Sequence, residues 1–238
     1  MAFTNYTSFI TILANELVVP VADSNYVTQL PQIIDGAEQR CYRELDLLNT
    51  IVTDATASLS TGTRAFNLPS SNGTFVVVEN INVITPSGQT PNLGTRNTLV
   101  PVSRDVINFL YPSSSGSTVP TYFAMLTQTT ILVAPWPDAA YTVEVVGTIR
   151  PTPLAASNAT TLLTQYFPDL FFAAAMVEGA AYLKNFGATA DDPRMSMTWE
   201  KHYQDLMQSA AIEEARKKFT MAGWSSKQPS SQATPPRT

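Results

Sequence analysis

The sequence contains very little of the side chains that carry redox and metal chemistry. Its 238 residues include one cysteine, Cys41, and one histidine, His202. One cysteine cannot close a disulfide within the chain, and these two residues are too small a set for a thiolate or imidazole metal site. We therefore expect no disulfide framework, no metal site and no cofactor.

Charge is also scarce. Charged residues make up 14% of the sequence, whereas soluble domains typically carry about 25%. With a net charge of -5, the chain is not suited to grip the phosphate backbone of nucleic acid. A surface with few charges dissolves poorly unless polar side chains or partner subunits cover it. The composition is compatible with burial of some of the surface against other proteins.

Long apolar runs are missing as well. The longest stretch without a charge, residues 106–137, is rich in Ser, Thr and Pro, so it cannot cross a bilayer. The first residues lack the basic start and the small-residue cleavage site of a signal peptide. We expect a soluble protein located in the cytoplasm before any assembly.

The lysines are unevenly distributed. None precedes Lys184, and all five lie in the last quarter of the chain: Lys184, Lys201, Lys217, Lys218 and Lys227. The C-terminal segment therefore differs chemically from the Ser/Thr-rich body, although chance in so small a set would give the same pattern.

Two helices are predicted at the N-terminal end. The first covers residues 9–18, with Thr7 or Ser8 as its cap. The second begins near Pro31, which suits a first helical turn because its missing N–H has no partner there. An apolar stripe follows at helical spacing: Ile34, Ala37, Cys41, Leu45 and Leu48. Cys41 is therefore expected to be a small core residue rather than a nucleophile.

Residues 51–150 have a strand pattern. Runs rich in β-branched residues, such as IVTDATASL and FVVVENINVI, alternate with turn residues. Residues 103–111 allow a short helix, and YFAMLT and TILVA are close enough to pair as a hairpin. Several short strands at short spacing predict a sandwich or barrel-like domain rather than a doubly wound sheet.

Two further helices are predicted after the strands. The first opens at Pro168, closes at Gly187 and carries a stripe of Leu170, Ala174, Val177 and Ala181. The second opens at Asp192-Pro193 and carries a stripe of Trp199, Tyr203, Leu206 and Ala210. Two ion pairs at i,i+4 spacing are expected on its surface: Glu213 with Lys217 and Glu214 with Lys218.

These elements predict an α+β fold, in which a helical bundle from the N- and C-terminal helices carries an inserted antiparallel β sandwich or barrel-like domain. Four regions are expected: N-terminal helices in residues 1–50, a β domain in residues 51–156, C-terminal helices in residues 157–222 that pack with 1–50, and a flexible tail in residues 223–238. The stripes around Ile34 and Leu170 are expected to face each other.

The sequence contains none of the common catalytic motifs and no recognisable set of catalytic partners. It contains no Walker-type phosphate loop, no Rossmann fingerprint and no Gly-x-Ser-x-Gly elbow. His202 has no recognisable triad partners and is expected to be a surface or packing residue. The adjacent acids Asp191-Asp192 and Glu213-Glu214 suit capping and salt bridging rather than paired catalysis. We expect no enzymatic activity.

Four phrases resemble one family when taken in order: LPQIIDGAEQRCYRELDLL, GTRAFNLP, VPTYFAMLTQTTILVAPWPDAAYTVEVVG and RPTPLAASNATTLLTQYFPDLFFAAAMVEGAAYLKN. Together they are similar to the head-to-tail adaptor, or connector, proteins of short-tailed bacteriophages, over about residues 30–203. The order and spacing of the phrases carry the resemblance. Its most telling elements are the strand–Pro-x-Pro-Asp–strand segment and the Pro-Asp opening of the Ala-rich helix.

The resemblance implies a structural protein of the virion. Adaptors of this kind form a twelve-fold homo-oligomeric ring that joins the portal protein to the tail nozzle, and DNA passes through the ring without specific binding. The resemblance also implies that the C-terminal helix and tail dock on the portal. Here those positions are Arg216, Lys217, Lys218, Phe219, Met221 and Trp224. An ordinary amphipathic helix end with a frayed terminus would account for the same residues.

The sequence leaves two other functions open. The chain could be an accessory capsid or tail-decoration protein that uses its β domain for contacts with neighbours. A small hydrolase with a β-sandwich body is a poorer candidate, because convergent acids are missing.

Overall fold

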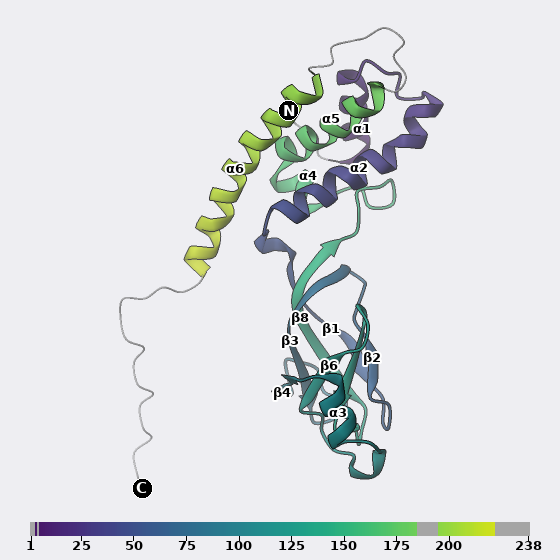
Figure 1. Ribbon diagram of the computed structural model, residues 1–238, viewed down its shortest axis with the longest axis vertical. Helices are drawn as coiled ribbons and strands as arrows, with labels where there is room; N and C mark the ends of the chain where they lie inside the picture. Colours follow the sequence, from purple (N-terminus) through teal and green to yellow (C-terminus); the bar gives the residue numbers. More distant parts are fainter. Residues whose placement is uncertain (1–2, 4, 185–194, 222–238) are drawn as a thin grey trace.

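The structure is a computed structural model, which describes residues 3, 5–184 and 195–221, with the backbone alone at 182–184 and 219–221. The fold is α+β, with most helices gathered at one end and two sheets at the other (Figure 1). The helices are α1 Tyr6–Glu16, α2 Ser24–Glu44, α3 Arg104–Leu110, α4 Leu162–Tyr166, α5 Pro168–Lys184 and α6 Met195–Met221, with 3-10 turns η1 Leu48–Thr50 and η2 Ser114–Gly116. The strands are β1 Ile51–Leu59, β2 Ala65–Asn67, β3 Gly73–Thr85, β4 Thr95–Thr98, β5 Val100–Pro101, β6 Tyr122–Met125, β7 Thr130–Ala134 and β8 Tyr141–Pro151.

The first helix starts earlier than predicted, because Asn5 is its cap instead of Thr7 or Ser8. The Asn5 side chain accepts from the Ser8 N–H at 2.9 Å, and the Ser8 hydroxyl oxygen accepts from the Asn5 N–H at 3.2 Å. This reciprocal capping box satisfies two backbone donors that a helix start otherwise leaves open. The helix ends at Glu16, before Pro20.

The prediction that the second helix begins near Pro31 was wrong. α2 begins at Ser24, and Pro31 lies inside it. Asp23 caps the helix by accepting from the backbone N–H groups of Asn25 and Tyr26. Tyr26 is fully buried and donates its hydroxyl to the carbonyl of Ile10 at 3.0 Å. The cap and this packing extend the helix ahead of Pro31, although proline has no N–H to donate there.

The rest of the predicted stripe on this helix is partly correct. Ile34, Ala37 and Cys41 are buried within α2, and Cys41 is a free thiol in the core. The helix ends at Glu44, so Leu45 is its C-terminal cap and Leu48 lies in η1.

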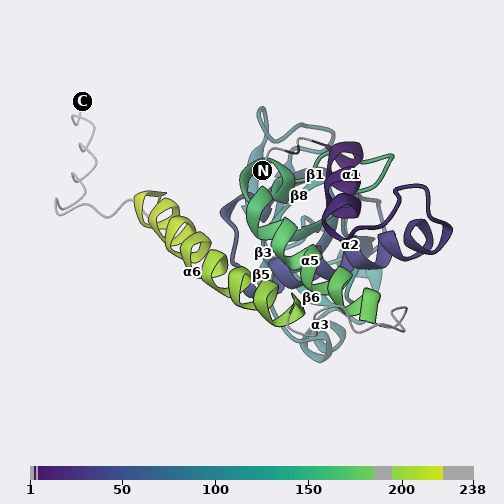
Figure 2. The same cartoon turned by 90° about the horizontal axis from the view of Figure 1, so that it is seen from above.

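Helix α5 is the centre of the helical end of the molecule. It contacts both α2 and α6, and Figure 2 shows it between them. Residues 170–176 are all buried, so the helix is apolar on every side there instead of along one stripe. From the predicted stripe, Val177 is half-buried and Ala181 is exposed. Gly187 and Asp192-Pro193, predicted to end α5 and begin α6, lie outside the described residues.

One core cluster joins the N- and C-terminal helices. Ile34 and Leu170 both belong to it, which confirms that their two faces pack together. Phe9 stacks on Phe171 with ring centroids 4.7 Å apart, and Tyr203 of α6 is fully buried in the same cluster. The bundle therefore forms from segments at opposite ends of the sequence.

The strands form a sandwich, and those described form no closed barrel. One sheet has the order β1-β8-β3-β4 and the other β2-β7-β6-β5. Residues from both sheets, including Ile81, Val133 and Val143, share a second core cluster. Helix α3 covers the outer face of the second sheet, where Ile107 packs on Leu132 and Ala134. The predicted β6–β7 hairpin and the short helix at 103–111 are confirmed.

The sheets are not wholly antiparallel as predicted. β5 pairs parallel with β6, with Val100 opposite Tyr122. The chain between these strands runs through α3 and η2, which gives it the length that a parallel connection needs.

Candidate functional site

The predicted portal-docking residues lie at and beyond the end of α6. Arg216 is exposed, whereas Lys217 and Lys218 are half-buried. Phe219 and Met221 belong to the helix, but their side chains are outside the described set, and Trp224 lies outside the described residues. The structure thus brings the three basic residues onto one helix end.

Lys217 is held by acidic side chains of its own helix. Its Nζ is 2.7 Å from Glu213 and 2.8 Å from Glu214, and it lies 5.1 Å from the centre of the Phe167 ring. Hydrogen bonds to Glu213 and Glu214 raise the pKa of Lys217. The predicted pair of Glu213 with Lys217 is confirmed.

The predicted pair of Glu214 with Lys218 is wrong. Glu214 is 5% exposed, and its side chain turns inward to accept a hydrogen bond from the backbone N–H of Leu48 at 2.8 Å. Lys218 instead forms an ion pair with Asp46, in the segment before η1. Helical spacing alone does not reveal these tertiary partners, because they lie about 170 residues earlier in the chain.

A second buried carboxylate lies on α2. Glu38 is 2% exposed, and both of its oxygens accept from the backbone N–H of Leu154 at 3.2 Å. Burial raises the pKa of Glu38 to about 7, and the hydrogen bonds from Leu154 and from the Thr161 hydroxyl offset this only in part. One turn further along α2, the hydroxyl of Tyr42 is buried and has no hydrogen-bond partner among the described residues.

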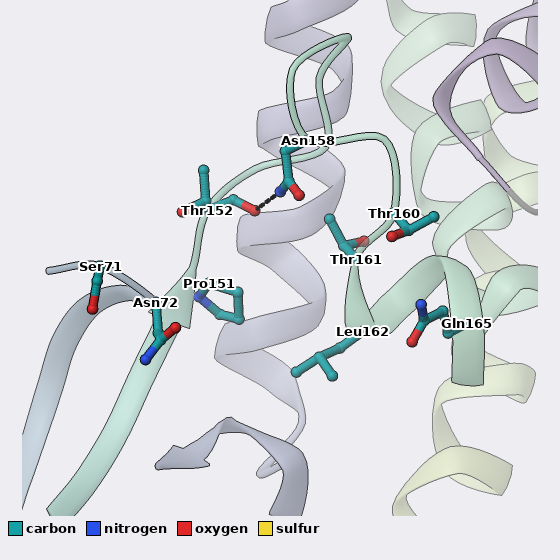
Figure 3. Close-up of a pocket in the computed structure, with 9 residues that line it drawn as sticks. All are labelled: Ser71, Asn72, Pro151, Thr152, Asn158, Thr160, Thr161, Leu162 and Gln165. Atoms are coloured by element: carbon teal, nitrogen blue, oxygen red, sulfur yellow. Dashed lines mark hydrogen bonds between the residues drawn. The ribbon is translucent and has the colours of Figure 1, made fainter. Parts of the chain in front are cut away.

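A shallow hollow of about 330 Å³ lies where the sandwich meets the helices (Figure 3). Its lining is polar but carries no charge: Ser71, Asn72, Pro151, Thr152, Asn158, Thr160, Thr161, Leu162 and Gln165. Asn158 donates to the carbonyl of Thr152 at 2.8 Å, the dashed line in Figure 3. Such a lining can form hydrogen bonds, but its residues include no carboxylate, imidazole, amine or thiol that would act as a general acid or base.

One wall of this hollow is fixed by a buried aspartate on β1. Asp54 accepts from the side chains of Ser71 and Asn72, and from both the backbone and the hydroxyl of Thr56. Burial would raise the pKa of Asp54, but these four hydrogen bonds outweigh it and lower the value. Asp54 therefore ties the loop before β3 to β1.

The most exposed aromatic side chain in the described β region is Phe109 of α3, at 83% exposure. Val106 and Leu110 on the same helix are also exposed, as is Val100 of the neighbouring edge strand β5. Ile107 faces the opposite way, into the core. This outer α3 face is therefore apolar and without a partner among the described residues.

Neither a metal site nor a membrane span is found in the described residues. Among residues 3, 5–184 and 195–221, no group of three or more His, Cys, Asp and Glu side chains could hold a metal ion. No helix in these ranges is long and apolar enough to span a membrane. His202 is exposed and packs edge-on against Trp199, as expected for a surface residue.

Sequence reasoning missed the roles of Glu38 and Glu214, although a signal was present. Glu38 follows Ile34 by four residues, and Glu214 follows Ala210 by four, so each acid continues an apolar stripe. An acid at a core-facing position is uncommon unless it has a partner. That pattern indicates a buried carboxylate that accepts hydrogen bonds from a partner in the core.

These features describe an α+β protein whose buried acids fix its own backbone, and whose exposed apolar face lies on the β region. Comparison with protein families gives a specific match: the family described as SU10 adaptor protein covers residues 4–227. The chain therefore belongs to the SU10 adaptor protein family, so it is a bacteriophage adaptor and a structural protein of the virion. A search of the curated proteins found no match.

Proposed function

We propose that this chain is a subunit of the ring that joins the portal protein of a short-tailed phage to the tail nozzle. The observation that carries the proposal is the family match over nearly the whole chain. In this role the subunit docks beneath the portal, forms a platform for the tail and leaves a conduit for DNA. The ring has twelve copies, assembled from subunits made in the host cytoplasm.

The charge distribution supports passage of DNA without specific binding. The chain has a net charge of -5, and like charge disfavours adhesion to phosphate. Residues 51–156 carry few charges, and several of those are engaged within the subunit, such as Glu144 with Arg96 and Asp54 with its loop. Flanks with few free charges can be buried against identical neighbours in a head-to-tail ring.

Portal docking is proposed for the segment from Arg216 to Trp224. Phe219, Met221 and Trp224 would supply apolar anchors, and Arg216, Lys217 and Lys218 would face acidic groups of the portal. Lys217 and Lys218 already have acidic partners in their own chain. We therefore expect the apolar anchors to contribute more to the affinity than these two lysines.

Truncation tests this docking segment. A chain that ends at Lys218 retains the ion pairs of both lysines but lacks the three anchors. A chain that ends at Trp224 retains the anchors and lacks only the tail, so it is the matched control. Purified portal of the same phage should bind the full chain and the control, and should lose affinity for the 1–218 chain. Equal affinity of all three, with unchanged circular dichroism, would contradict the docking proposal.

An accessory virion protein remains the alternative, and the exposed apolar face of α3 is the observation that favours it. Such a protein would use the β region for contacts with a neighbour away from the portal. The location and copy number of the chain in the virion distinguish the two functions.

A further inference from the structure

The chain passes between the helical bundle and the β sandwich at two places, and a buried glutamate holds each of them. The outgoing passage follows α2 and leads into β1, and its Leu48 N–H is held by Glu214 of α6. The returning passage leaves β8, and its Leu154 N–H is held by Glu38 of α2. Leu48 lies three residues before β1 begins, and Leu154 lies three residues after β8 ends.

The two passages enter one sheet side by side. β1 and β8 are antiparallel neighbours, with Ile51 opposite Thr148. β8 also pairs with β3 along most of its length. A displacement of either passage therefore moves the sheet β1-β8-β3-β4 as a unit, and with it the sandwich.

Helix α6 is fixed to the bundle before it reaches the outgoing passage. Arg40 of α2 forms two hydrogen bonds of 2.6 Å with Glu200, and Tyr203 donates its hydroxyl to Glu44 at 2.8 Å. About three turns after Tyr203, Glu214 contacts Leu48, and about one turn later Lys218 contacts Asp46. One helix thus bridges the bundle and the segment that leads into the sandwich.

Burial of Glu214 is not needed for its ion pair with Lys217. Glu213 forms the same kind of bond with Lys217 at 2.7 Å, with a side chain that is 56% exposed. Burying a carboxylate removes its hydration, which must be offset by hydrogen bonds. What Glu214 has in addition is the Leu48 backbone, so its burial serves to hold the passage.

We propose that α6 acts as a strap that sets the orientation of the β sandwich, with Glu214 as the positioning residue on Leu48. Glu38 holds the second passage, and the two contacts together prevent the sandwich from rotating about either passage alone. This role is separate from portal docking, because it acts within a single subunit.

The adjacent acids provide a matched pair of variants. Glu214→Ala and Glu213→Ala each remove one partner of Lys217, but only Glu214→Ala removes the acceptor of the Leu48 N–H. Spin labels at Val27→Cys on α2 and Leu93→Cys in the β region report the orientation, since both positions are exposed. Cys41 is fully buried and should remain unlabelled. Double electron–electron resonance then measures the distance between the labels in the full chain.

The strap predicts a broader distance distribution with a shifted mean in Glu214→Ala, and the native distribution in Glu213→Ala. A second pair of variants changes the donor of the same hydrogen bond instead of its acceptor. Leu48→Pro removes the donor, and the preceding Leu47 already has the extended backbone, φ −79° and ψ 128°, that a following proline requires. Leu48→Ala is its side-chain control and retains the N–H.

Broadening in Glu214→Ala or in Leu48→Pro, but not in the matching control, supports the strap. Native distributions in whichever of the two variants fold would overturn it. The measurement involves no portal, so failure of the docking proposal would leave this result unaffected.

Discussion

Glu38 and Leu154 lie 116 residues apart in the chain, yet both carboxylate oxygens of Glu38 accept from the Leu154 N–H at 3.2 Å. The contact joins α2 to the segment that returns from the last strand. It is made by an acid that is 2% exposed, and burial raises the pKa of that acid to about 7. Because burial raises the pKa of Glu38 more than the Leu154 hydrogen bond lowers it, the burial of this acid makes stability depend on pH.

The first prediction concerns this pH dependence. The folded protein raises the Glu38 pKa from 4.5 to about 7, so it favours the protonated carboxyl. The contribution of Glu38 to the free energy of unfolding is therefore complete below about pH 4 and is lost as the pH rises through 7. Glu38→Gln removes the ionisation and keeps an oxygen for the Leu154 N–H. Its gain in the free energy of unfolding over wild type should be roughly 2 kcal/mol larger at pH 8 than at pH 5. Urea denaturation at the two pH values measures it, with exposed Glu79→Gln as control. An equal difference at both pH values would contradict the assignment.

The second prediction concerns Glu144, whose effect on stability depends on pH in the opposite direction. Glu144 is buried and accepts from Arg96 at 2.8 and 3.0 Å and from Asn82 at 2.9 Å. The Arg96 guanidinium lowers the pKa of Glu144, so its contribution to stability is present above the unfolded value and is lost as the pH falls. Arg96→Gln should therefore move acid unfolding to a higher pH. A circular dichroism titration tests this, and an unchanged midpoint would be evidence against it.

The third prediction concerns the proposed division into a helical unit, 1–50 with 157–222, and a β unit, 51–156. Phe171→Ala removes a fully buried ring that stacks on Phe9 and should cost about 3–5 kcal/mol. Gly147→Ala places a Cβ 2.2 Å from the Val77 carbonyl oxygen and should disturb the β unit. Hydrogen exchange should show faster opening in the affected unit only. Equal loss of protection throughout the chain, for both variants, would argue for a single unit.

The fourth prediction concerns the exposed face of α3. Phe109 is 83% exposed and Ile107 of the same helix is 1% exposed. Phe109→Ser should change the free energy of unfolding by less than about 0.5 kcal/mol, whereas Ile107→Ala should cost about 2–5 kcal/mol. Thermal or urea unfolding distinguishes them. A large loss of stability in Phe109→Ser would mean that its side chain is packed.

The sequence was sufficient where local chemistry and spacing agree. Strands β1, β3 and β8 and the β6–β7 hairpin were predicted from periodicity and turn residues. So was the packing of the α2 face that carries Ile34 on the α5 face that carries Leu170. The start of α2 was missed, because the Asp23 cap and the buried Tyr26 outweigh the preference of Pro31 for a first turn.

The functional residues were harder to predict, because their partners are distant in the chain. Helical spacing predicts a pair of Lys218 with Glu214. In the fold, Lys218 pairs with Asp46 instead, and Glu214 accepts from the Leu48 N–H. Glu38 and Glu214 could have been noted as acids on apolar faces. Their backbone partners could not be predicted, because almost every residue carries an N–H group and the sequence does not show which one meets the acid.

The central claim is that this adaptor forms a ring on the portal. The most direct measurement is the mass and the rotational symmetry of the full chain, alone and mixed with portal of the same phage, by native mass spectrometry and electron microscopy. We expect a closed ring of twelve identical copies on one face of the portal. A portal that carries only single copies, or none, would contradict the claim.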